Sequence, residues 1–88
     1  MVEKTVKVIN RAGLHARPAS MIVEIAKDFS SSIHFYLDSS EINAKSVLGI
    51  ITLGAAYGSE IKMTAEGPDE KAALDALEKV FNSKFEEE

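Results

Sequence analysis

The sequence contains no cysteine and no tryptophan, and its 88 residues include only two prolines. Without cysteine the chain can form neither a disulfide framework nor a thiolate metal site, and it has no thiol nucleophile. Nothing in the composition requires an oxidising compartment, so we expect a cytoplasmic protein. A chain of this length accommodates one domain, which we expect to span residues 1–88.

Long apolar runs and basic clusters are missing as well. The longest stretch without a charged residue, 46–59, is interrupted by three glycines and is shorter than the roughly 20 residues of a membrane span. The first residues show no signal-peptide pattern. Ten basic against fourteen acidic residues give a net charge of −4, and no basic run is present. We therefore expect neither membrane insertion nor nucleic-acid binding, which needs a basic face.

The spacing of apolar residues predicts seven elements of secondary structure. Alternation of apolar and polar side chains indicates four strands, at residues 5–9, 33–37, 41–44 and 60–66. Apolar residues at helical spacing indicate three helices, at residues 16–28, at residues 47–53, and in a last segment that opens at residues 67–69. The order is β-α-β-β-α-β-α. Strands with one polar face predict a two-layer α+β open-faced sandwich, in which helices cover an antiparallel sheet on one side.

The same patterns predict which side chains are buried. In the first helix the inward residues are expected to be Ala16, Ala19, Val23 and Ala26. Thr64 should point outward from the last strand, and the apolar stripe of the last helix should continue to Phe85. Asp75 can pair with Lys79 one turn later on the exposed face of that helix. The acidic end, residues 86–88, is expected to be solvated and frayed.

The most informative segment is Gly-Leu-His-Ala-Arg-Pro-Ala at residues 13–19. A proline is tolerated only in the first turn of a helix, so Pro18 places His15 at or beside the N-cap. Helix N-termini hold anions well, and Arg17 adds a guanidinium suited to phosphate or carboxylate. Gly13 lets the loop bend so that the imidazole is exposed. The residues fit a phosphoryl-bearing histidine, and they fit equally a surface histidine beside a solvated arginine.

This segment resembles the active-site signature of the HPr family, the histidine-containing phosphocarriers of the sugar phosphotransferase system. Lys-Ser-Val-Leu-Gly at residues 45–49 is similar to the serine site of that family, and residues 53–54 and 65–67 match it too. The resemblance covers essentially the whole chain. It implies one HPr-like domain whose sheet has the strand order 1-4-2-3 and carries three helices on one face.

The resemblance further implies a phosphoryl carrier rather than a free-standing enzyme. His15 would accept a phosphoryl group on Nδ1 from phosphorylated enzyme I and pass it to enzyme IIA domains. Arg17 would contact that group, and Ala16, Arg17 and Pro18 would form its cradle at the helix start. We expect no cofactor, and no metal, because His15 and His34 lack a metal-ligand spacing. Small transient carriers are usually monomers, so we expect a monomer.

Ser46 has two interpretations. From the residues alone it is an N-cap, because its hydroxyl can accept a hydrogen bond from an amide of the helix that follows. The resemblance implies phosphorylation by HPr kinase/phosphorylase, and docking of the phosphorylated form on the catabolite control protein. It also implies a docking surface on the first two helices, formed by Ser20, Met21, Glu24, Val47, Leu48 and Ile51.

Two alternatives to the sugar-system carrier stay open. The chain could be a regulatory binding module that acts only through its serine form. It could also be a paralogue from the nitrogen-related branch of the phosphotransferase system, which would use the same histidine. The presence of His15 favours a carrier, because a purely regulatory paralogue need not keep it. An independent hydrolase lacks the required set of nucleophile, base and orienting acid.

Overall fold

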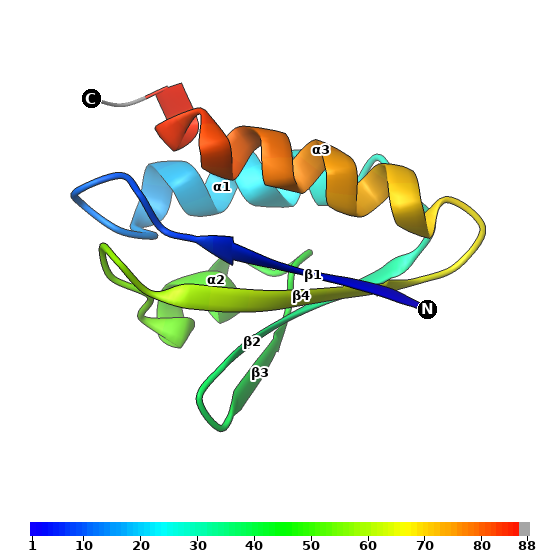
Figure 1. Ribbon diagram of the computed structural model, residues 1–88, viewed down its shortest axis with the longest axis horizontal. Helices are drawn as coiled ribbons and strands as arrows, with labels where there is room; N and C mark the ends of the chain where they lie inside the picture. The colour runs from blue at the N-terminus through cyan, green and yellow to red at the C-terminus, as the bar shows by residue number, and fades with distance from the viewer. Residues whose placement is uncertain (87–88) are drawn as a thin grey trace.

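The structure, a computed structural model, describes residues 1–86. Within these residues it has four strands and three α-helices (Figure 1). The strands are β1 (Val2–Lys7), β2 (Ser32–Leu37), β3 (Ser40–Asn43) and β4 (Glu60–Glu66). The helices are α1 (Ala16–Ala26), α2 (Val47–Leu53) and α3 (Glu70–Asn82), followed by a short 3-10 helix, η1 (Lys84–Glu86).

The four strands form one antiparallel sheet in the order β1-β4-β2-β3. The central strand β4 pairs on both sides, so that Ala65 lies opposite Val2 of β1 and Ile33 of β2. Helices α1 and α3 contact each other and lie side by side over the sheet, whereas α2 packs against α1 and β3 (Figure 1). The predicted two-layer α+β sandwich and its strand order are therefore confirmed.

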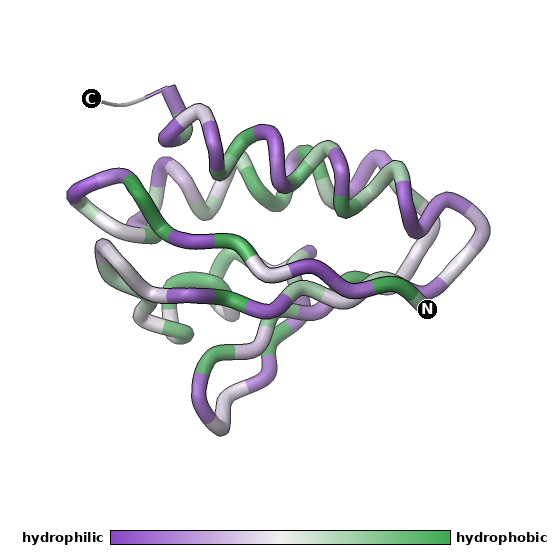
Figure 2. Tube along the Cα trace, in the orientation of Figure 1, coloured by the Kyte–Doolittle hydropathy of each residue, from purple (hydrophilic) through white to green (hydrophobic). Residues whose placement is uncertain are grey.

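The core lies between the sheet and the two long helices. Apolar and polar segments alternate along β1 and β4 (Figure 2), as expected of strands with one buried face. Phe81 of α3 stands edge-on to Phe35 of β2, with ring centroids 6.0 Å apart, and to Phe85, at 4.9 Å. All three rings are fully buried, so they join the last helix and the chain end to the sheet.

Both predicted ends of the first strand and the predicted end of the first helix were wrong by two or three residues. The first strand runs from Val2 to Lys7, not from 5 to 9, because its ladder ends where β4 begins, at the pair Lys7–Glu60. The first helix ends at Ala26 rather than at residue 28. Beyond it the amides of Asp28 and Phe29 donate to carbonyls three residues earlier, at 3.1 and 3.2 Å, and this tighter turn closes the helix.

Four predictions about individual side chains were also wrong. Ala16 is exposed, because it is the first residue of α1 and lies between the exposed residues His15 and Arg17, whereas the core begins at Pro18 and Ala19. Thr64 is buried, because it lies on the central strand between Glu3 and His34. Phe85 is buried as predicted, but it lies in η1 rather than in α3. Asp75 pairs with Lys71, at 3.1 Å, and with Lys4 of β1, at 3.5 Å, instead of Lys79.

At the acidic end of the chain, Glu86 closes η1, where its amide donates to the Ser83 carbonyl at 3.0 Å. It is exposed to solvent, as expected. Residues 87–88 lie outside the described part of the chain.

Asp69 joins the loop after α1 to the loop before α3. Its carboxylate accepts hydrogen bonds from the Ser30 amide at 2.9 Å, from the Ser31 amide at 3.0 Å, and from the Ser31 hydroxyl. The Ser31 hydroxyl, and after it the Ser30 amide, lower the pKa of Asp69 from 3.8 to about 2. The ionised carboxylate therefore holds together two loops that are distant in sequence.

Replacing Asp69 with asparagine is expected to lower the Tm by roughly 5 °C near neutral pH. Asparagine keeps one acceptor oxygen but replaces the other with an NH2 donor, which would face a donor of Ser30 or Ser31, and it lacks the negative charge. The folded pKa lies below the ordinary value of 3.8, so the carboxylate stabilises the fold above that pH. This contribution is lost as the pH falls toward about 2. Thermal melts followed by circular dichroism across that range measure both effects.

The control is Asp28→Asn, which makes the same change at an exposed aspartate beyond the end of α1. This variant should melt like the parent chain at every pH. An acid-induced loss of stability that is as steep in Asp69→Asn as in the parent would contradict the role of the Asp69 carboxylate.

Candidate functional site

The loop before α1 has a fixed conformation. Asn10 stabilises the loop through two hydrogen bonds to Gly13. Its side-chain Nδ2 donates to the Gly13 carbonyl at 2.8 Å, and its backbone carbonyl accepts a hydrogen bond from the Gly13 amide at 3.1 Å. The Leu14 amide donates to the Ala55 carbonyl at 3.0 Å, which ties the loop to the end of α2. Gly13 has φ +74°, and a Cβ there would lie 2.8 Å from the Ala55 oxygen. Only glycine permits this close approach.

This loop delivers His15 to the N-cap of α1, where its backbone is extended (φ −85°, ψ −165°) and its side chain is exposed. The Ala19 amide donates to the His15 carbonyl at 2.9 Å, the first hydrogen bond within the helix. Pro18 is buried in the first turn and has no amide hydrogen. The amides of Ala16 and Arg17 therefore lie ahead of the helical hydrogen-bond ladder, where the helix dipole is positive.

Ala16 and Arg17 are both exposed beside His15. A histidine, a guanidinium and the amides of a helix start therefore share one solvent-accessible corner. Such a corner stabilises an anion, and a phosphoryl group on the imidazole would have its negative oxygens within this positive surrounding.

Ser46 is the N-cap of α2. Its hydroxyl accepts a hydrogen bond from the Gly49 amide at 3.0 Å, and its extended backbone (φ −119°, ψ 114°) precedes the helix. The helix ends at Gly54, whose φ of +69° is left-handed. The N-cap and the bounds of α2 were both predicted from the sequence, and the structure confirms them.

The residues expected to dock partners lie on α1 and α2, which contact each other. On α2, Leu48 is 70% exposed, Ile51 41% and Val47 37%, whereas Ile50 and Leu53 are buried. On α1, Ser20 and Glu24 are exposed and Met21 is half-buried. The structure thus brings an apolar group together with polar neighbours, an arrangement typical of a transient interface.

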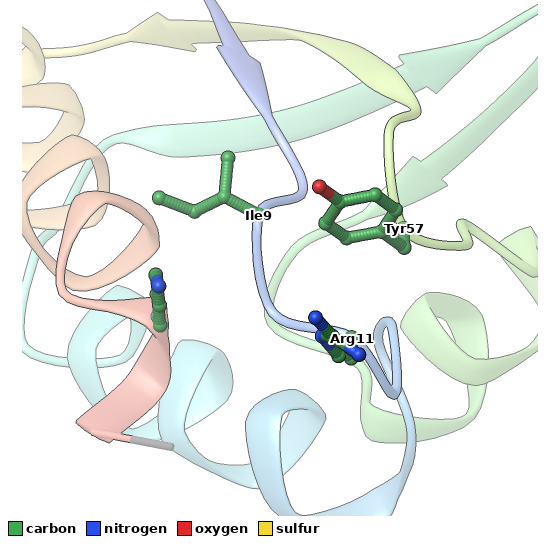
Figure 3. Close-up of a pocket in the computed structure, with 4 residues that line it drawn as sticks. Ile9, Arg11 and Tyr57 are labelled. Carbon is green, nitrogen blue, oxygen red and sulfur yellow. The ribbon is translucent and has the colours of Figure 1, made fainter. Parts of the chain in front are cut away.

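Sequence reasoning missed one concave feature. Ile9, Arg11, Tyr57 and Lys84 line a cavity of about 430 Å³ (Figure 3). These residues come from three separate segments of the chain and share no local pattern, so no sequence signal could have grouped them.

Within residues 1–86 no three histidine, aspartate or glutamate side chains gather as a metal ion would require. Nor is any helix in this part of the chain both long and apolar enough to cross a membrane.

Fold and site together define a small open-faced α+β protein that presents a histidine and an arginine at a helix start, next to a partly apolar face. The family described as PTS HPr component phosphorylation site matches residues 2–83. The phosphocarrier protein HPr of Treponema pallidum (strain Nichols) is 53% identical over 88 residues, which is 100% of both chains. The chain therefore belongs to the HPr family of the phosphotransferase system, and the predicted family is confirmed.

Two solved structures extend the comparison. The crystal structure of HPr-C-His from Thermoanaerobacter tengcongensis matches with a TM-score of 0.96 and 46% identity, covering 100% of this chain and 99% of that one. The crystal structure of the Bacillus subtilis catabolite repression protein Crh, a domain-swapped dimer, matches with a TM-score of 0.77 and 36% identity, covering 96% and 97%. Both phosphocarriers and a catabolite repression protein therefore share this architecture.

Proposed function

We propose that the chain is the phosphoryl carrier of a bacterial sugar phosphotransferase system. His15 accepts a phosphoryl group from phosphorylated enzyme I and passes it to enzyme IIA domains, for coupled sugar uptake and phosphorylation. The observation that carries this proposal is the exposed position of His15 at the N-cap of α1, beside Arg17. Membership of a phosphocarrier family supports it.

The chemistry requires little covalent machinery from the protein. Nδ1 of the neutral imidazole forms a bond to phosphorus while the bond between phosphorus and the donor atom breaks, and the reverse exchange delivers the group to the acceptor. Such transfers depend on positioning and on charge stabilisation. Imidazole suits both directions, because it is largely neutral, and so nucleophilic, at physiological pH. Arg17 and the amides of Ala16 and Arg17 would bind the phosphoryl oxygens.

Intact-mass analysis tests the proposal directly. The chain is incubated with phosphoenolpyruvate and a catalytic amount of enzyme I, and then with an enzyme IIA domain. We expect a single acid-labile phosphoryl adduct that disappears when the enzyme IIA domain is added. No adduct, with an enzyme I that phosphorylates a control carrier, would contradict the carrier function.

Replacing Arg17 with alanine is expected to slow phosphoryl transfer by about a hundredfold, because one charged donor to the phosphoryl oxygens is lost. Stability should change little, since an exposed arginine contributes little to the fold. The matched variant Arg17→Lys keeps the charge but loses the planar guanidinium group, so its transfer rate should lie between those of the parent chain and Arg17→Ala. Rapid-quench kinetics measure the transfer rate, and thermal melts measure stability. A loss of Tm that parallels the loss of rate would argue that Arg17 is structural.

Ser46 allows charge to be separated from capping. Asparagine and aspartate both cap helices well, so Ser46→Asn and Ser46→Asp should both fold. Only aspartate adds a negative charge beside the exposed apolar residues of α2. We expect Ser46→Asp to raise the KM for enzyme I roughly three- to tenfold relative to Ser46→Asn. Equal KM values would show that charge at this position does not control docking.

Regulation through Ser46 is the second candidate function, and the likeness to Crh favours it. Phosphorylation of Ser46 by HPr kinase/phosphorylase would place a dianion at the start of α2, and the phosphorylated form would dock on the catabolite control protein. A carrier of the nitrogen-related branch would use His15 with other partners. Transfer of phosphate to a sugar-specific enzyme IIA distinguishes the sugar-system carrier from a module that acts only through Ser46 and from a carrier of the nitrogen-related branch.

We propose that the protein is cytoplasmic and monomeric. Sedimentation analysis distinguishes a monomer from a Crh-like dimer.

A further inference from the structure

The cavity around Tyr57 is lined by none of the residues of the His15 corner or of the expected docking surface. Its volume of about 430 Å³ falls within the size range of small-molecule sites. Ile9 and Arg11 enter it from the loop after β1, Tyr57 from the loop before β4, and Lys84 from η1. Figure 3 shows Ile9, Arg11 and Tyr57 arranged around the same opening.

Three segments form the walls of the cavity: the loop after β1, the loop before β4, and η1. Backbone hydrogen bonds hold the first two of these segments together. The Val8 amide donates to the Ser59 carbonyl and the Gly58 amide to the Val8 carbonyl, both at 2.8 Å. These bonds flank Ile9 on one side and Tyr57 on the other. The two loops are therefore joined before any ligand arrives, and little ordering is needed on binding.

The third wall of the cavity, η1, is held in place by the buried ring of Phe85. Lys84 and Phe85 have φ values of +57° and +55°, a left-handed turn that is costly for residues other than glycine. Phe85 is fully buried and stands edge-on to Phe81, 4.9 Å away. Burial of this ring keeps the turn in place, and Lys84, which precedes the ring in the turn, lines the same cavity as Arg11.

The charge of this site is opposite to that of the chain. The net charge is −4, yet among residues 1–86 the charged side chains that line the cavity are the cations Arg11 and Lys84. The guanidinium of an arginine matches phosphate oxygens in pairs, and a lysine adds a mobile point charge. Tyr57 is 64% exposed, so one face of its ring is available for stacking, and Ile9 adds apolar surface.

We propose that this cavity binds a nucleoside monophosphate. Its phosphate lies between Arg11 and Lys84, and its base stacks on Tyr57, since every base offers a π-face to an aromatic side chain. Two cations suffice for one phosphomonoester but not for a polymer, which needs a longer basic surface. The proposal does not depend on the carrier function of His15.

The test uses the full chain and adenosine 5′-monophosphate as the probe, with binding measured by NMR titration and calorimetry. We expect saturable binding, with shift changes centred on the cavity residues. Arg11→Gln and Lys84→Gln should each weaken it roughly tenfold, and so should Tyr57→Ser. All three residues are exposed, so the variants should fold. Adenosine and inorganic phosphate should each bind more weakly than the nucleotide.

Lys62→Gln is the matched control. Lys62 lies 5.1 Å from the ring centroid of Tyr36 on the sheet, so the control also removes a lysine charge beside a tyrosine, and it should leave affinity unchanged. Equal affinity for inorganic phosphate and the nucleotide would overturn the assignment of a nucleotide. Absence of saturation at millimolar probe, an equal loss in the control, or shifts centred on His15 and Arg17 would overturn the site.

Discussion

Replacing His15 with alanine is expected to abolish phosphorylation by enzyme I and phosphoryl transfer to enzyme IIA, while the variant folds normally. The side chain is exposed, and alanine has no atom that can carry the group. The loss should therefore be complete rather than partial. Intact-mass analysis after incubation with phosphoenolpyruvate and enzyme I measures it, and a thermal melt checks the fold.

His34→Ala is the control for this experiment. His34 is the second histidine of the chain and lies half-buried on β2, opposite Asn43 and Thr64. Its replacement should leave the adduct in place, at some cost in stability. A His15→Ala variant that still relays phosphate, or an adduct that depends on His34 instead, would contradict the assignment of His15.

The largest expected effect on stability comes from Gly67→Ala. Gly67 has φ +151°, and a Cβ on it would lie 2.6 Å from the Oγ and 2.7 Å from the Cα of Ser31. Ser31 is buried and bonded to Asp69, so it cannot move aside without breaking that link. We expect the free energy of unfolding to fall by roughly 2–4 kcal/mol, as measured by urea denaturation.

Gly58→Ala separates the steric clash from backbone strain. Gly58 also has a positive φ, +91°, but a Cβ there would meet no atom within 4 Å. This variant should lose only about 1 kcal/mol from the unfavourable backbone conformation. If both variants lose the same stability, contact with Ser31 is not the reason that residue 67 is glycine.

The sequence predicted most of the fold because helix and strand periods are local signals. The bounds of β4 and α2 follow directly from clean alternation and from a serine cap with a glycine stop. The start of β1 was missed because Glu3 and Lys4 interrupt the apolar pattern. The structure explains Lys4 by its pairing with Glu78 of α3, at 3.0 Å, a contact between residues 74 positions apart.

The candidate site divides in the same way. His15, Arg17 and Ser46 stand out because each lies beside a helix start that proline or serine marks in the sequence. The Asp69 link and the cavity around Tyr57 could not be predicted, because each joins loops that meet only after the sheet has formed. The left-handed turn at Lys84 could not be predicted either, because it contains no glycine, the residue that usually marks such a turn in a sequence.

The hydrogen bond from the Leu14 amide to the Ala55 carbonyl bears on how partners bind in turn. It fastens the loop that bears His15 to the segment that follows α2, and so limits how far the backbone of His15 can move relative to α2. If His15 carries the phosphoryl group, donor and acceptor must occupy the same surface in turn and can never occupy it together. Enzyme I and enzyme IIA domains would then compete for one binding surface, and their relative concentrations would set the rate of phosphoryl transfer.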